Sequence, residues 1–119
     1  MGQVKFLKNW NNKLNNNYFL TVRLHTPSKK RYYTNQIINF EKVNVLLGKN
    51  EELYCRAKLV YMDIDLFKNI PEWLSYVDSG LSKTEFYNLL EEFYKDKKEW
   101  KGKYTKLIIL CYMRVDGNV

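Results

Sequence analysis

One stretch near the C-terminus constrains the fold more than any other part of the chain: residues 105–115, TKLIILCYMRV. Its odd and even positions are both apolar, so a β-strand formed here has two apolar faces. Such a strand needs packed side chains on both faces, which is typical of the middle of a sheet. The sequence therefore predicts a central strand at residues 105–115, with the rest of the chain folded around it.

Residues 18–25, YFLTVRLH, predict a second strand, because β-branched and aromatic residues alternate there with period two. One face of this strand is apolar, and the other carries three polar side chains: Thr21, Arg23 and His25. A strand that serves only the core has no need of a hydroxyl, a guanidinium and an imidazole at alternate positions. The polar face is either ordinary surface or the wall of a site.

Further strands are predicted upstream of the central one. Residues 36–40 and 42–47 predict two short strands, followed by a turn at residues 48–50. Residues 52–65 predict a long strand whose apolar register switches faces near Val60. A β-bulge or a sharp bend produces such a switch, and small barrels need bends of this kind.

The clearest helix signal lies in residues 82–100. Ser82 and Glu85 form a capping box, and Leu81 can pack against Phe86 as a hydrophobic staple. Apolar side chains follow at helical spacing, which indicates core rather than a ligand platform. These side chains are Phe86, Leu89, Leu90, Phe93 and, if the helix continues, Trp100.

A short helix is predicted at residues 4–14, and residues 66–77 are predicted to be irregular to helical. We find no internal repeat and no linker, so residues 1–119 are interpreted as a single domain. The predicted fold class is α+β. A small, bent, mixed β-barrel is expected, with a short N-terminal helix and one main amphipathic helix packed against it.

The cysteine and histidine content of the chain argues against a disulfide framework and a metal site. Two cysteines, Cys55 and Cys111, lie in apolar strands and are interpreted as core residues of a protein in a reducing compartment. With one histidine and no CxxC motif, we expect no metal site and no cofactor. The chain has no run of 18 apolar residues and no apolar leader, so we expect no membrane segment and a cytoplasmic location.

The formal net charge is +7, and it is unevenly distributed. Residues 1–60 carry 11 Lys and Arg against 3 acids, whereas residues 61–119 carry 9 against 10. This asymmetry predicts a basic face that attracts phosphate polymers or an acidic surface. Lysine accounts for 16 of the 20 cations, so an AT-rich coding sequence is an alternative source of the charge.

Two runs of cations stand out. The first follows the Thr21 strand in a predicted loop at residues 26–33: Lys29, Lys30 and Arg31, with Tyr32 and Tyr33. Cations beside aromatic rings bind single-stranded nucleic acids, although a solubilising loop has the same composition. The second run is interleaved with acids and is interpreted as a solvated helix end. It comprises Lys95, Lys97, Lys98, Lys101, Lys103 and Lys106.

The chain resembles the ASCH domain family of the PUA-like superfamily over roughly residues 4–115, and we suspect a phage or mobile-element member. The resemblance rests on the T-x-R strand, the G-x-S-x-x-E-F helix entry and their order along the chain. The residues that carry it are Thr21, Arg23, Gly80, Ser82, Glu85 and Phe86. It implies a β-barrel with flanking helices, a cleft beside the T-x-R strand, and a link to RNA binding.

Some members of this family are amidohydrolases acting on N4-acylated cytidine, and others resemble nucleases. In the amidohydrolases a lysine, a threonine and a downstream carboxylate carry the chemistry. Thr21 matches the threonine, whereas Tyr18 stands at the lysine position, with Lys13 the nearest basic residue. Ser79, next to Asp78, stands at the carboxylate position. The resemblance therefore leaves Thr21, Tyr18 and Asp78 as catalytic candidates and leaves the activity open.

The sequence is compatible with three functions. The first is binding of RNA or a nucleotide in the cleft and on the adjacent basic loop. Its predicted residues are Thr21, Arg23, His25, Lys29, Lys30, Arg31 and Tyr32. The second is an enzyme, either an acylcytidine-type amidohydrolase or a ribonuclease with rearranged residues. The third is a viral interaction protein that binds a host protein.

Overall fold

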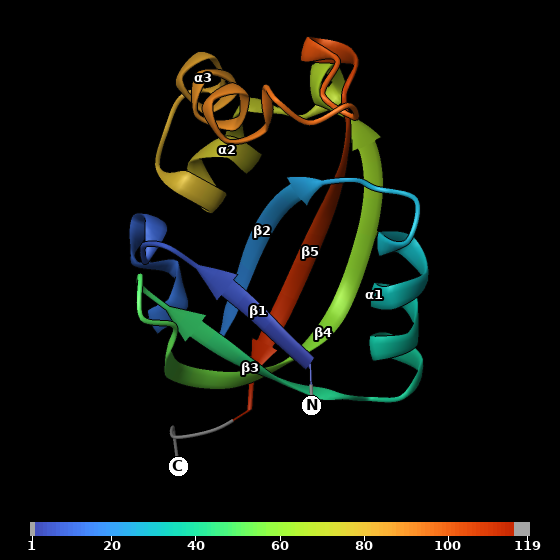
Figure 1. Ribbon diagram of the computed structural model, residues 1–119. Helices are drawn as coiled ribbons and strands as arrows, with labels where there is room; N and C mark the ends of the chain where they lie inside the picture. The colour runs from blue at the N-terminus through green and yellow to red at the C-terminus, as the bar shows by residue number, and fades with distance from the viewer. Residues whose placement is uncertain (1, 116–119) are drawn as a thin grey trace.

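The structure, a computed structural model, describes residues 2–115. Within this range five strands form one sheet in the spatial order β1-β3-β4-β5-β2. β1 runs parallel to β3, and the other neighbouring pairs are antiparallel. The long strand β4 curves along one side, so that the sheet forms a curled half-barrel (Figure 1). The strands are β1 Gly2–Phe6, β2 Tyr18–Leu24, β3 Lys42–Leu47, β4 Glu52–Leu66 and β5 Lys106–Arg114.

The central strand predicted near the C-terminus is confirmed as β5. It pairs with β2 on one side and with β4 on the other. Ile108 and Leu110 point into the core inside the curl, whereas Leu107 and Ile109 belong to a second core on the outer face. Both faces of this strand are therefore packed against other side chains, which explains why both are apolar.

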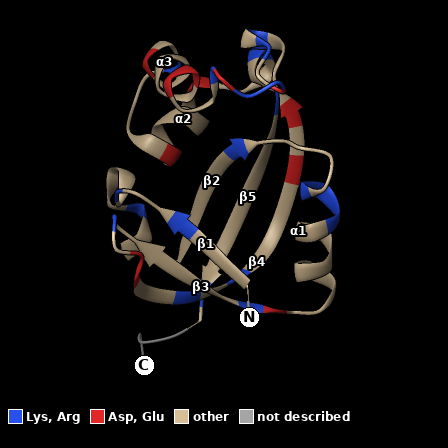
Figure 2. Ribbon diagram, viewed as in Figure 1, with Lys and Arg blue, Asp and Glu red and all other residues tan. Residues whose placement is uncertain are grey.

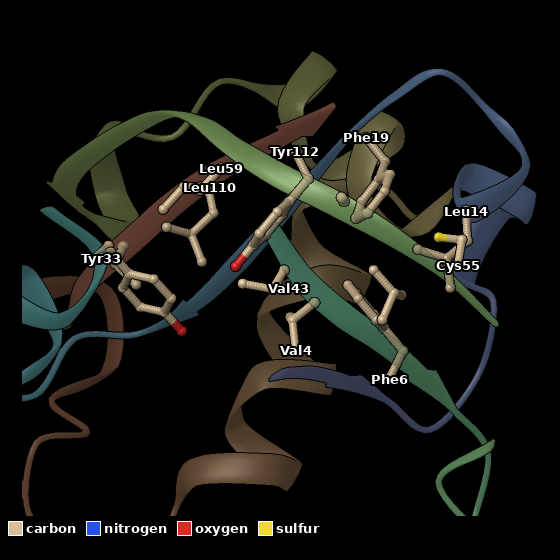
Figure 3. Close-up of a cluster of buried hydrophobic side chains, with 13 residues drawn as sticks. Val4, Phe6, Leu14, Phe19, Tyr33, Val43, Cys55, Leu59, Leu110 and Tyr112 are labelled. Carbon is tan, nitrogen blue, oxygen red and sulfur yellow. The ribbon is translucent and has the colours of Figure 1, made fainter. Parts of the chain in front are cut away.

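Side chains from all five strands meet inside the curl (Figure 3). Phe19 stacks on Tyr112 with 5.5 Å between ring centroids, and Phe6 lies edge-on to Phe19 at 6.0 Å. Cys55 is buried in this core, and Cys111 on β5 is half-buried, so the expectation of two core cysteines holds fully only for Cys55.

The register switch predicted in residues 52–65 is confirmed. The pairing of β4 with β5 shifts between Leu59 and Tyr61, which leaves Val60 as the extra residue of a bulge. Up to Leu59 the inward side chains have odd numbers, and beyond the bulge Met62 and Ile64 pack against the same core. The bulge lets one 15-residue strand follow the curl of the sheet.

Residues 2–115 contain three α-helices: α1 Lys29–Ile38, α2 Glu72–Ser79 and α3 Lys83–Tyr94. Three short 3-10 turns accompany them: η1 Trp10–Asn15, η2 Phe67–Asn69 and η3 Gly102–Tyr104. α2 and α3 lie together at one end of the sheet, and α1 lies beside β4 (Figure 1). None of the helices in the described range is both long and apolar enough to cross a membrane.

The predicted capping box at the start of α3 is confirmed. The Glu85 N–H donates to the Ser82 hydroxyl at 3.2 Å, and the Ser82 N–H donates to the Glu85 carboxylate at 3.1 Å. The helix ends at Tyr94, so the predicted extension to residue 100 is wrong. No apolar residue lies between Tyr94 and Trp100, so a further turn would have nothing to pack against.

The helix predicted at residues 4–14 is wrong, because this segment begins as β1 and continues only as the short turn η1. Val4 and Phe6 are buried at alternate positions, and β1 pairs with β3. Leu7 would belong to the apolar stripe of the predicted helix, yet 61% of its surface is exposed. Spacings of three and four residues in a short segment do not separate a helix from a strand followed by a turn.

The predicted basic loop at residues 26–33 and the predicted strand at residues 36–40 are also wrong. Both fall largely within α1, so the domain has more than one main helix. Tyr33, Gln36 and Ile37 pack inward at helical spacing. Tertiary contact therefore selects the helix in a segment whose local sequence also fits a turn and a strand.

Candidate ligand-binding site

A cavity of about 200 Å³ lies beside the polar face of β2. β1 and β2 are the two edge strands of the sheet, and residues of both strands line it. η1, the end of α2 and one side of α3 complete the wall. Its polar lining includes Lys13, Thr21, Arg23 and Asp78, and aromatic rings of Phe6, Trp10 and Phe93 also line it.

A buried ion pair forms one wall of this cavity. The Lys13 ammonium, from η1, donates to the Asp78 carboxylate near the end of α2. Only 3% of the Lys13 side chain and 8% of the Asp78 side chain are exposed. The Val22 N–H of β2 also donates to the Asp78 carboxylate. The pair thus joins three segments that are distant in sequence.

Burial moves both members of the pair toward their neutral forms. Burial lowers the pKa of the Lys13 ammonium. The negative charge of Asp78 opposes this shift, and the positive charge of Arg23 adds to it. Burial raises the pKa of the Asp78 carboxyl, against the opposing effects of Lys13, the Val22 N–H and Arg23. Ionisable groups perturbed in this way inside a cavity are candidates for function.

Arg23 connects the two edges of the curled sheet. Its Nη2 donates to the Lys5 carbonyl of β1 at 2.7 Å, and its Nε donates to the Thr21 hydroxyl at 3.2 Å. The guanidinium also lies over the Phe6 ring, 4.7 Å from the centroid. These contacts hold the guanidinium in one orientation and place the Thr21 hydroxyl, on a residue only 3% exposed, inside the cavity.

A second, more open pocket of about 650 Å³ lies next to the cavity. Arg23 and Lys5 line both, and Lys29 and Tyr32 contribute from α1. The Lys29 ammonium lies 5.8 Å from the ring centroid of Tyr33. A cation-lined pocket therefore adjoins the cavity, and Arg23 lines both of them.

The other predicted site residues lie elsewhere. Lys30 and Arg31 are exposed on α1 and line neither pocket. His25 lies outside both, and burial, helped by Lys106 and Lys30, lowers the pKa of its imidazole. Tyr18 is 58% exposed on β2, away from the cavity. Thr21, Arg23 and Asp78 are brought together in the cavity, and Lys29 and Tyr32 beside it.

Lys13 was missing from the predicted site. The sequence signal that could have found it was its place as the nearest basic residue before the T-x-R strand. A lysine in an asparagine-rich segment indicates surface, so its burial follows only from the contact between η1 and α2. Within residues 2–115 no three His, Cys, Asp or Glu side chains gather as a metal site would require.

No family model matches the sequence, and no curated protein matches it. Among solved structures, the chain is similar to the crystal structure of protein EF3133 from Enterococcus faecalis V583, of the family DUF984. The two agree with a TM-score of 0.55 and 11% sequence identity, over 85% of this chain and 61% of that one. What they share is the fold. This chain spans about 61% of the length of EF3133.

Proposed function

We propose that the protein binds one nucleotide unit, either free or within an RNA strand, with its base in the cavity and its phosphate in the adjoining open pocket. The observation that carries this proposal is that Arg23 lines both spaces. An arginine fork suits a phosphate or a base edge, and this one is held in place by Lys5, Thr21 and Phe6.

The lining of the cavity fits a base. Lys13 and Arg23 supply donors, Asp78 supplies acceptors and Thr21 supplies both, which matches the mixed donors and acceptors on a base edge. Aromatic side chains provide surfaces on which a base can stack. The cavity volume, about 200 Å³, lies below the range of about 300–1,000 Å³ of typical drug-sized ligand sites and therefore favours one ring system.

We further propose that the chain is an ASCH-like member of the PUA-like superfamily. Support comes from the T-x-R strand and the capped helix entry in the sequence, and from the fold that the chain shares with a DUF984 protein. RNA binding is linked to that family, which agrees with the nucleotide proposal.

The test is fluorescence anisotropy of a labelled short single-stranded RNA at about 50 and 200 mM salt, with Arg23→Ala beside the wild type. Arg56→Ala is the matched control, because it removes the same charge from an exposed position on β4. We expect Arg23→Ala alone to weaken binding by at least about tenfold, equivalent to about 1.4 kcal/mol. Equal losses in both variants, or no binding at the lower salt, would refute the proposal. Competition with a free mononucleotide separates the two forms of the ligand.

A second candidate function is hydrolysis of an N4-acylated cytidine. The observation in its favour is that Lys13 and Asp78 lie in the same cavity as Thr21. The lysine and the carboxylate of the family pattern are therefore both present, although from other positions in the chain. Lowering the pKa of Lys13 increases the fraction of neutral amine near pH 7, and only the neutral amine can accept a proton from a hydroxyl nucleophile.

Chromatography of N4-acetylcytidine incubated with the protein tests this second candidate. We expect cytidine and acetate to form with the wild type and not with Thr21→Val, which removes the hydroxyl but keeps the shape. Near-ultraviolet circular dichroism checks that the variant remains folded. Turnover that persists in Thr21→Val, or no turnover by the wild type at millimolar substrate, would exclude this chemistry.

A further inference from the structure

Only the first part of the second run of cations, Lys95 to Lys98, forms the predicted solvated helix end. α3 ends at Tyr94, and Lys101 and Lys103 lie in and beside η3 instead. η3 is packed next to η2, which carries Lys68, and lysines gather at this end of the molecule (Figure 2). The fold thus brings lysines from separate parts of the chain to one place.

Lys83, Lys101 and Lys103 line an open pocket of about 630 Å³, and Lys68 lies beside it against the Tyr104 ring. We call it the lysine pocket; its main lining residues are Phe67, Lys83, Tyr87, Lys101, Lys103 and Tyr104. No acidic side chain lines it among residues 2–115. It shares no lining residue with the cavity beside β2, and it lies on another side of α3.

Aromatic rings and a carbonyl hold the ammonium groups in place. The Lys83 ammonium donates to the Lys68 carbonyl at 3.0 Å and lies 5.3 Å from the Phe67 ring centroid. The ammonium groups of Lys68 and Lys103 lie 5.1 and 5.4 Å from the centroid of the Tyr104 ring. Each contact orients a cation without neutralising it.

The lysine pocket lacks internal counterions. Within the described range, none of the ion pairs involves Lys68, Lys83, Lys101 or Lys103. The nearby Glu72 carboxylate accepts a hydrogen bond from the Lys83 backbone N–H. Four like charges at one place repel one another, and a multivalent anion between them would remove that cost.

We propose that the lysine pocket binds the phosphate groups of a polyphosphorylated ligand. Ammonium groups act as point charges with several donors, which suits phosphate oxygens in varied orientations. The rings of Phe67, Tyr87 and Tyr104 also line the pocket, and the contacts of the ammonium groups with them limit where the cations can lie. Two sources carry this chemistry: successive phosphates of an RNA strand, and a free polyphosphate such as a nucleoside triphosphate.

The test is calorimetric titration of the whole protein with inorganic tripolyphosphate at about 50 and 200 mM salt. Lys101→Gln/Lys103→Gln is the test variant. Lys97→Gln/Lys98→Gln is the matched control, because it removes the same charge from the same segment at exposed positions outside the pocket. We expect the test variant to lose at least about tenfold in affinity and the control to stay within about twofold.

Equal losses in the two double variants would reduce the signal to diffuse charge and overturn the proposal, as would absence of tripolyphosphate binding at low salt. Arg23→Ala is titrated in parallel, because Arg23 also lines the open pocket proposed above for a phosphate. A tenfold loss in Arg23→Ala with no loss in the test variant would place the anion at Arg23 and also overturn the proposal. A twelve-nucleotide RNA titrated in parallel identifies the source. If the RNA binds more tightly than tripolyphosphate and loses affinity in the test variant, the pocket is assigned to an RNA strand. If tripolyphosphate binds more tightly, the pocket is assigned to a free polyphosphate.

Discussion

The cavity and the lysine pocket both have lysine side chains against aromatic rings, but these lysines differ in burial and in charge pairing. In the cavity the Lys13 ammonium lies 5.1 Å from the Phe6 ring centroid, is almost wholly buried and is paired with Asp78. In the lysine pocket the exposed Lys68 and Lys103 lie at similar distances from Tyr104, and no carboxylate in residues 2–115 pairs with them. The distance to a ring therefore does not indicate what a lysine does, whereas its burial and its counterion do.

The difference has an energetic consequence. A buried ion pair has lost much of its hydration, so its attraction must offset a cost of several kcal/mol per ion. Exposed lysines keep their water, and their interactions are screened by salt over about 8–10 Å. Removing the charge of Lys13 should therefore change the stability of the fold. Removing charges from the lysine pocket should instead weaken the salt-dependent attraction of anions.

The largest expected effect comes from breaking the buried pair. Asp78→Ala leaves the Lys13 ammonium buried without its partner, which should lower the free energy of unfolding by about 3–5 kcal/mol. Urea denaturation followed by circular dichroism measures this loss.

The exposed pair Lys5–Glu51, with 2.7 Å between nitrogen and oxygen, provides the control. Its side chains are 58% and 49% exposed, so Glu51→Ala should cost no more than about 1 kcal/mol. A similar loss in Asp78→Ala and Glu51→Ala would show that burial does not distinguish the two pairs.

The elements of the fold differ in how far the sequence predicts them. The central strand, the bulge near Val60 and the capping box at Ser82 were predictable because each depends on neighbouring residues in one segment. The helix α1 was not, because its inward face is recognised only when the sheet it packs on is known. Local sequence patterns therefore predict those elements whose conformation depends on neighbouring residues in the chain, and not those that depend on tertiary contacts.

The sites follow the same rule. Thr21 and Arg23 stand two residues apart on one strand, and the sequence placed them on one polar face. The Lys13–Asp78 pair joins residues 65 positions apart, and nothing local in either segment indicates the contact. The lysine pocket likewise depends on η2 and η3 lying side by side. A charge run shows how many cations a segment has, but the partners that it meets come from the fold.

A second prediction separates stability from function in the cavity. Replacing both members of the pair, Lys13→Met with Asp78→Asn, removes both buried charges and keeps an acceptor for the Val22 N–H. Because such replacements are often neutral or stabilising, the double variant should unfold within about 1.5 kcal/mol of the wild type. Its affinity for the RNA probe should nonetheless fall by at least about tenfold, or about 1.4 kcal/mol. Unchanged affinity would mean that the pair is purely structural.

The third prediction concerns acid pH. Because burial raises the pKa of the folded Asp78 carboxyl, this group favours the folded state below its unfolded pKa of about 3.9, and that contribution is lost as the pH rises through the folded pKa. The wild type should therefore gain stability relative to Lys13→Met/Asp78→Asn as the pH falls from about 7 to 4, with a slope of at most about 1.4 kcal/mol per pH unit.

Glu85 should behave in the opposite way. The Ser82 N–H lowers the pKa of the Glu85 carboxylate, so its contribution is present above its unfolded pKa of about 4.3 and is lost as the pH falls through the folded pKa. Urea denaturation at four pH values, with Glu85→Gln beside the double variant, compares the two signs. Parallel curves for all three proteins would contradict the assignment for both groups.

The smallest expected effect tests whether the two regions are coupled through α3, which lines both of them. One side of this helix contributes Phe86 and Leu90 to the cavity, and Lys83 and Tyr87 contribute to the lysine pocket. Ser82→Ala removes the cap and should cost about 1 kcal/mol of stability. Because Lys83 begins the helix while Leu90 lies two turns later, tripolyphosphate affinity should fall more than RNA affinity at Arg23. Equal losses at the two places would show that the helix moves as one body and that burial does not isolate the cavity from the exposed pocket.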